Sequence, residues 1–255
     1  MLRRLYNNRS LRDNVMLGTL TAFSAGMVNV TSLIIFLAFT SNVTGHYAIL
    51  AQEIARGNWL EAGIVLAWIS LFFLGNFVAN LFVVNSRSQY LSHAMPLIAE
   101  IACMIFIGIY LQEFYASRLW ETELMVAIML FAMGLQNGLT ASVSNMSLKT
   151  THLTGLTTDL AISFSMLTKK EHRQDPKVVE KAWLLGVVLT SYMVGGIVAG
   201  VVYLELRNGV FFVVSGLLAL VILYDLFKIS ITRYISGSQP FIRKSYFERE
   251  VVRRE

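Results

Sequence analysis

Long apolar runs alternate with short polar breaks along this chain. Six runs are long enough to cross the roughly 30 Å hydrocarbon core of a bilayer. They cover residues 15–39, 59–84, 94–114, 122–145, 183–206 and 209–228. Two shorter amphipathic segments, 43–56 and 153–168, would cover only about 20–24 Å as helices. The runs are continuous rather than alternating, which favours helices over a β-barrel. The pattern predicts an all-α, polytopic helical membrane protein.

The two halves of the chain repeat the same motifs. Each half has a Gly-x-x-Asn motif, a Thr-Gly pair after it, and then a Gly-x-x-Val-Ala motif at 75–79 or 195–199. The first two motifs comprise Gly26, Asn29, Thr44 and Gly45 in one half, and Gly134, Asn137, Thr154 and Gly155 in the other. Duplicated, interrupted hydrophobic units are common in transporters. We therefore expect two structural repeats, each with three full spans plus one short or broken helix.

The predicted organisation is a basic N-terminus (1–14), membrane repeats at 15–114 and 115–228, and a basic tail (229–255). The second repeat contains a polar, basic loop at 169–182. By the positive-inside rule, both termini and this loop are expected on the cytoplasmic side. If the short segments do not cross, six spans make the second repeat an inverted copy of the first. If they do cross, eight spans make the copies parallel. Charge does not decide between these topologies, and segment length favours six.

Composition narrows the class further. Of 255 residues, 55% are hydrophobic and only 15% are charged, with a mean hydropathy of +0.59. A soluble domain of this size needs more polar surface. The single cysteine, Cys103, excludes an internal disulfide and a cysteine-cluster metal site. The chain contains no HExxH, GxSxG or Walker motif, so we expect no enzyme, no metal and no cofactor. The expected partners are the lipid bilayer, a small-molecule or ion substrate and a second copy in a homodimer, with no nucleic acid.

The two Thr-Gly pairs are the first candidates for a site. Thr44 and Thr154 can each cap a helix, and Gly45 and Gly155 allow a turn or a close approach. A helix that begins inside the membrane directs free N–H groups and partial positive charge inward, where an anion or carboxylate can bind. Two inverted starts could share one central site. Ordinary helix caps at the interface remain the alternative.

Polar side chains inside the spans are the second group of candidates. Asn29, Gln136 and Asn137 could line a substrate path, or could simply bond neighbouring helices. Glu100 lies in the apolar run Met95–Leu111, where an ionisable group is costly and points to function. Glu100, and Asp159 on the second short segment, are the candidates for proton or cation coupling. A structural salt bridge is the alternative for Glu100.

Two strings of the sequence resemble a known family. FTSNVTGHYAILAQEIARGNW is similar to the first signature of the YoaK-type bacterial membrane proteins, and FAMGLQNGLTASVSNMSLKTTHLTGLTTDLA is similar to the second. The resemblance covers residues 15–228 and implies a multi-pass protein of the bacterial inner membrane. It implies no activity, because the family is uncharacterised. Where the family pattern has an acidic residue in the first span, this chain has Asn29.

Together these features predict a small permease for an anionic or carboxylate-bearing metabolite, with coupling to protons as one form. A passive channel that uses the same site is one alternative. The other is a non-transporting scaffold or sensor that holds partners through the basic tail and the 169–182 loop.

Overall fold

The computed structural model describes residues 11–85, 89–144 and 151–235. Over these residues all regular structure is helical, which confirms the all-α prediction. The helices are α1 (Leu11–Phe36), α2 (Val43–Arg56), α3 (Trp59–Asn85), α4 (Gln89–Glu113), α5 (Leu119–Val143), α6 (Leu153–Leu167), α7 (Lys170–Arg173), α8 (Pro176–Leu206) and α9 (Val210–Ile235), with a 3-10 turn η2 (Arg207–Gly209) between the last two. The basic stretches 1–10 and 236–255, which carry much of the orientation argument, lie outside the described residues.

Five helical segments of the described chain are long and apolar enough to cross a membrane. The last of them, Pro176–Tyr224, has 49 residues because it joins α8, η2 and most of α9. Large apolar side chains are exposed along the outer faces of α3 and α8, among them Phe73, Phe77, Trp183 and Ile197. An exposed apolar surface of this extent suits contact with lipid. The chain is therefore of the multi-pass membrane type.

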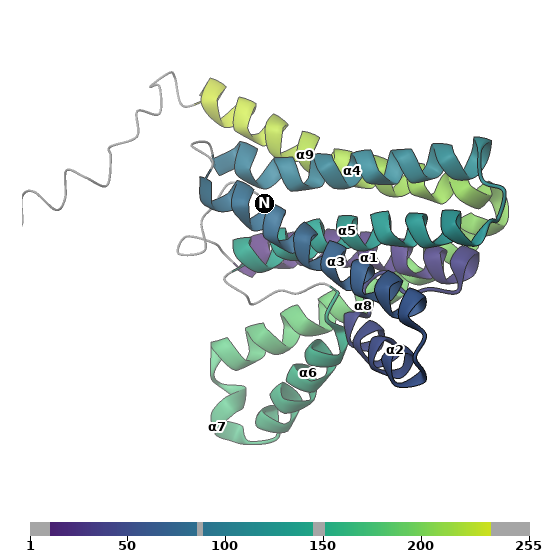
Figure 1. The fold of residues 1–255 in the computed structure, drawn as a ribbon. Coiled ribbons are helices and arrows are strands. Elements are labelled where there is room, and N and C mark those ends of the chain that lie inside the picture. The colour runs from purple at the N-terminus through teal and green to yellow at the C-terminus, as the bar shows by residue number, and fades with distance from the viewer. Residues whose placement is uncertain (1–10, 86–88, 145–150, 236–255) are drawn as a thin grey trace, which may run out of the picture.

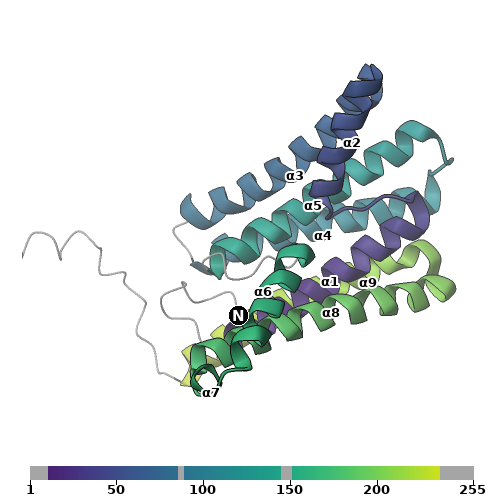
Figure 2. The same ribbon diagram turned by 90° about the horizontal axis from the view of Figure 1, so that it is seen from below.

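The two short helices begin near the middle of the bundle. After Phe36 the chain turns back through residues 37–42 and enters α2, which has 14 residues; α6 has 15. Figures 1 and 2 show that α2 and α6 start close together and run outward in opposite directions. At 1.5 Å per residue each helix is about 21–23 Å long, shorter than the hydrocarbon core.

Glycines mark the closest crossings between long helices. The two most extensive helix contacts are α1 with α8 and α3 with α5. Gly26 and Gly195 stand at the first crossing, and Gly75 and Gly134 at the second. A Cβ atom on any of the four would collide with a backbone carbonyl oxygen of the partner helix. Membrane helices lack a strong hydrophobic drive to associate, so such close backbone approach is a principal source of their packing energy.

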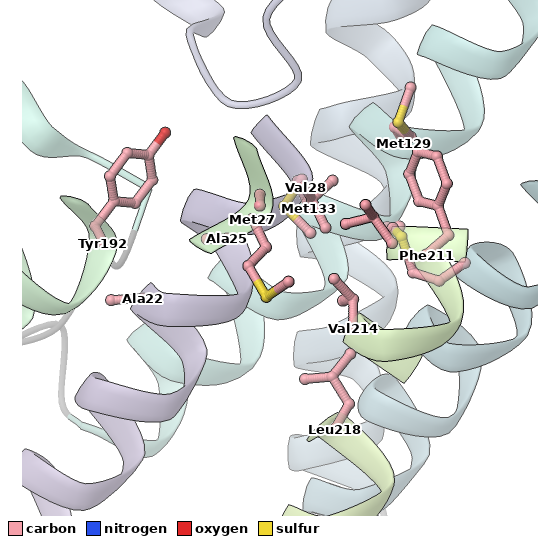
Figure 3. Close-up of a cluster of buried hydrophobic side chains, with 14 of the residues drawn as sticks. Ala22, Ala25, Met27, Val28, Met129, Met133, Tyr192, Phe211, Val214 and Leu218 are labelled. Atoms are coloured by element: carbon pink, nitrogen blue, oxygen red, sulfur yellow. The ribbon is translucent and has the colours of Figure 1, made fainter. Parts of the chain in front are cut away.

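Methionines fill much of the buried core between α1, α5 and α9. Figure 3 shows Met27, Met129 and Met133 near Phe211 and Val214, and all five side chains are fully buried. The thioether side chain is flexible and polarisable, so it fills irregular gaps between helices that cross at different angles. The core thus joins helices from both halves of the chain into one bundle.

Two of the differences from the predicted element boundaries have a local cause in the structure. The first helix ends at Phe36 rather than at residue 39, because Leu37 takes a positive φ of 55° and reverses the chain. The segment 169–182, expected as a polar loop, contains α7 and the first turns of α8. α8 begins early because the Asp175 side chain accepts a hydrogen bond from the Lys177 backbone N–H, and Pro176 occupies the first turn.

Candidate functional site

A cavity of about 560 Å³ opens between the starts of α2 and α6. This is within the roughly 300–1,000 Å³ typical of small-molecule sites. Four predicted site residues line it, two from each half of the chain: Asn29, Thr44, Asn137 and Thr154. The remaining lining residues are Phe39, Ser41, Asn42, Val43, Phe72, Asn76, Ala141, Thr151, His152, Leu153 and Tyr192. The structure therefore brings the two short-helix starts to one cavity.

The threonine hydroxyls at the two helix starts are open to this cavity. Thr44 and Thr154 lie in the first turns of α2 and α6, and both residues are exposed. Within the described part of the chain, neither hydroxyl has a hydrogen-bond partner. Both are therefore available to bind a solute.

The caps of the two short helices differ. At α2, the Asn42 side chain accepts a hydrogen bond from the Gly45 backbone N–H at 3.1 Å. At α6, His152 occupies the N-cap position and its side chain forms no capping hydrogen bond. The first N–H groups of a helix have no partner within the helix itself. The start of α6 is consequently the less satisfied of the two.

An asparagine on a long helix holds the segment that leads into each short helix. Asn29 on α1 accepts hydrogen bonds from the Thr40 backbone N–H at 2.9 Å and from the Thr40 hydroxyl at 3.3 Å. Asn137 on α5 accepts one from the Thr151 hydroxyl at 3.0 Å. Asn137 also donates to the Asn76 side-chain oxygen of α3 at 3.2 Å. Because both amides already bond the protein, they shape the cavity wall as well as line it.

The cavity is polar, and among the described residues no acidic, lysine or arginine side chain lines it. Its surface consists of amides, hydroxyls, one imidazole and a few apolar side chains. Each helix start adds a partial positive charge of about half an elementary unit. The two helix dipoles therefore favour a negatively charged group inside the cavity.

Three predicted site residues are placed elsewhere. Gly45 and Gly155 do not line the cavity. A Cβ on Gly45 would lie 2.7 Å from the Asn42 amide nitrogen, and one on Gly155 would collide with the His152 ring. The two glycines thus make room for the N-cap side chains. Gln136 donates to the Thr21 carbonyl at 2.6 Å and to the Ser24 hydroxyl at 2.7 Å, so it ties α5 to α1.

The two predicted coupling acids also lie away from the cavity. Glu100 is fully buried on α4. Asp159 lies on α6 with its side chain half exposed, 3.7 Å from the Lys181 ammonium on α8. Over residues 11–85, 89–144 and 151–235, no three His, Cys, Asp or Glu side chains come together as a metal site.

The sequence reasoning missed several residues of the cavity wall. Asn76 directly follows Gly75 in a repeated motif. Its amide side chain within an apolar span is the feature by which the sequence could have identified it. Tyr192 lines the cavity together with Asn29 and Ser41. It lies three positions before Gly195, in the helix that packs on α1. No local pattern marks that position.

The helical bundle and its apolar outer faces define a multi-pass membrane protein with a polar internal cavity. The chain belongs to the family described as protein of unknown function DUF1275, whose model matches residues 17–224. The resemblance to the YoaK-type proteins is confirmed at the level of the family, because these are the same family. No curated protein and no solved structure matches the chain.

Proposed function

We propose that this protein is a small permease that moves an anionic or carboxylate-bearing metabolite through the cavity between α2 and α6. The observation that carries the proposal is the meeting of two helix starts, with free threonine hydroxyls, at one cavity. The solute's negative group would lie against the first turns of both helices. Its remaining atoms would contact the neutral amides and the aromatic side chains of Phe39 and Phe72.

The glycine crossings support two inverted repeats as the basis of this permease. The Cβ sites of Gly26 and Gly134 meet the carbonyl oxygens of Tyr192 and Phe72, which are three positions before Gly195 and Gly75. Conversely, Gly195 and Gly75 meet the carbonyls three positions before Gly26 and Gly134, those of Phe23 and Phe131. Both of these glycine contacts at the α1–α8 crossing thus have a counterpart at the α3–α5 crossing.

Helix directions give the same correspondence. Figure 1 shows α1 and α5 running in opposite directions, and Figure 2 shows α2 and α6 pointing in nearly opposite directions. Helices α1 to α4 would then match α5, α6, α8 and α9, with α7 as an insertion. Inverted repeats place substrate at their interface and give alternating access by motion of one unit against the other.

Charge supports a cytoplasmic location for the chain ends. The start of α1, the end of α9 and the basic α6–α8 turn lie at one end of the bundle in Figure 1. Three arginines lie at the other end. Arg56 lies 3.4 Å from Glu53, Arg118 caps α5, and Arg207 stacks 5.7 Å from the Tyr203 ring centre. With basic residues concentrated at the end that holds the termini, the positive-inside rule makes that end cytoplasmic.

The direct test is uptake into proteoliposomes, using a panel of small anionic and neutral metabolites, with Thr44→Val and Thr154→Val introduced together. Valine keeps the shape of threonine and removes the hydroxyl. Losing a hydrogen bond to a charged group costs about 1.5–3 kcal/mol. We expect the apparent affinity for the transported solute to fall at least about tenfold, which corresponds to 1.4 kcal/mol.

The matched control is Thr157→Val, the same change on an exposed residue of α6 outside the cavity. It should leave uptake unchanged. If the double variant binds the transported solute with wild-type affinity, the proposed site is wrong. A wild-type protein that moves nothing from the panel would instead favour the scaffold or sensor alternative, and ohmic conductance without saturation would favour a channel.

The topology can be tested separately with a cysteine at Asn58, in the turn between α2 and α3, in a background that lacks Cys103. Six crossings place this cysteine on the periplasmic side, where an impermeant maleimide added to whole cells labels it. Labelling only after the cells are opened would support eight crossings and contradict the inverted repeats.

A further inference from the structure

Glu100 is a buried acid that does not line the cavity. Its relative exposure is 0%, and both carboxyl oxygens lack a hydrogen-bond partner within the described part of the chain. It lies on the inner face of α4, between the buried side chains of Leu97 and Met104. An acid kept for structure alone would be expected to bond a neighbour, as Glu121 does with the backbone N–H groups of Ala116 and Arg118 at 3.0 Å.

Within residues 11–85, 89–144 and 151–235, no basic side chain is described as a partner of Glu100. Cys103, one turn further along α4, is a partly buried free thiol. His93, two turns earlier on the same buried face, forms another interaction. None of the other ionisable residues of α4 and of the elements that contact it forms a described hydrogen bond with Glu100. They are Glu61 of α3, Glu121 and Glu123 of α5, Tyr90, Tyr110 and Glu113 of α4, Arg207 of η2, and Tyr224, Asp225, Lys228, Arg233 and Tyr234 of α9.

An ionised carboxylate at this position would have neither water nor a counter-charge, which is very unfavourable. Glu100 is therefore neutral while the interface stays closed. Water must reach the carboxyl before it can ionise.

α4 has a feature that makes such opening feasible. Pro96 lies inside the helix, one turn before Glu100. Proline has no N–H, so the carbonyl of Ser92 loses its helical donor at that point. Prolines of this kind are common sites of helix bending. On the far side of Glu100, Gly108 lies against the Phe212 ring of α9, where a Cβ would be 2.9 Å away. A bend at Pro96 would thus move Glu100 relative to α9.

We propose that Glu100 takes up and releases the proton that drives solute movement. This inference rests on the proposed function and names its coupling ion. In the closed interface the side chain is a carboxylic acid. When α4 moves and water enters, the O–H bond breaks, the proton passes to water, and the carboxylate keeps the electron pair. Uptake from the side of lower pH reverses the step.

The test is Glu100→Gln, which keeps the shape and neutrality of the acid but cannot release a proton. For one proton per solute, a pH difference of about one unit supports about tenfold accumulation in wild-type proteoliposomes. Glu100→Gln should lose this accumulation while exchange of labelled for unlabelled solute continues. The control Glu113→Gln, an exposed acid on the same helix, should behave as wild type. Wild-type accumulation by Glu100→Gln would overturn the proposal.

A second measurement separates this proposal from the permease itself. The infrared carbonyl band of a protonated carboxyl in the purified protein should be absent in Glu100→Gln and present in Glu113→Gln. If the wild-type protein moves no solute but shows this band, the permease proposal is wrong and Glu100 is still a proton-binding group. If the wild-type protein moves solute but Glu100→Gln removes no band, the permease proposal holds and the proposed role of Glu100 is wrong.

Discussion

Replacing Gly195 by alanine should separate two helices that now touch through their backbones. The added Cβ would collide with the carbonyl oxygen of Phe23 on α1. Its three nearest neighbours are all backbone atoms of Phe23, so no side chain can turn away to make room. Relief requires that α1 and α8 move apart, which weakens packing along their whole contact.

Overpacking of this kind typically costs about 1–3 kcal/mol. The gain in helix propensity from glycine to alanine offsets roughly 1 kcal/mol at most. We expect a net loss of about 1–2 kcal/mol in the free energy of unfolding, or roughly five- to thirtyfold in the folding equilibrium. Unfolding in mixed micelles, by titration with a denaturing detergent, measures this change.

The control is Gly186→Ala, nine positions earlier on α8, where a new Cβ meets nothing within 4 Å. That variant gains helix propensity without a clash, so its stability should rise by up to about 1 kcal/mol. The two substitutions are chemically identical and should have opposite signs. Equal effects from both would refute the claim that backbone contact at Gly195 holds α1 to α8.

Three further predictions concern single contacts. Gly57→Ala should lower the melting temperature of the purified protein, because Gly57 ends α2 at φ 76°, where a Cβ costs about 1 kcal/mol. Gln136→Leu should cost only about 1 kcal/mol in the detergent titration, since it breaks two bonds to α1 but also removes a buried oxygen that has no described partner. Tyr192→Phe removes a hydroxyl from the cavity wall that also holds Asn29 and Ser41, so a cysteine at Ser41 should be alkylated faster in that background.

Helix positions were largely readable from the sequence because lipid requires long, uninterrupted apolar runs. The short helix α2 begins and ends where the sequence placed it, at Val43 and Arg56, and α6 ends one residue earlier than expected. Helix ends that depend on a single backbone angle could not be predicted from the sequence. The positive φ of Leu37 has no signature in its side chain, so the end of α1 was placed too late.

The cavity could be predicted only in part. Repetition singled out Asn29, Thr44, Asn137 and Thr154, because a residue pattern that occurs twice stands out from a single sequence. Which of the candidates share a space depends on helix rotation and crossing, which the sequence does not state. Gln136 adjoins Asn137 in the chain yet points to α1, since neighbouring positions on a helix face directions about 100° apart. The two-repeat plan, the substrate and the crossing number stay predictions.

The pairing of the long helices also constrains how the chain can be made. α1 leaves the ribosome before α8, but its most extensive contact is with α8, which is encoded some 140 residues later. α3 likewise precedes α5, its own main partner. Helix α1 must therefore stay in the lipid without its main neighbour until α8 has been synthesised. A polypeptide cut short before α8 would present the Gly26 face of α1 to lipid and to membrane proteases, so fragments of the first half alone should be degraded rather than accumulate.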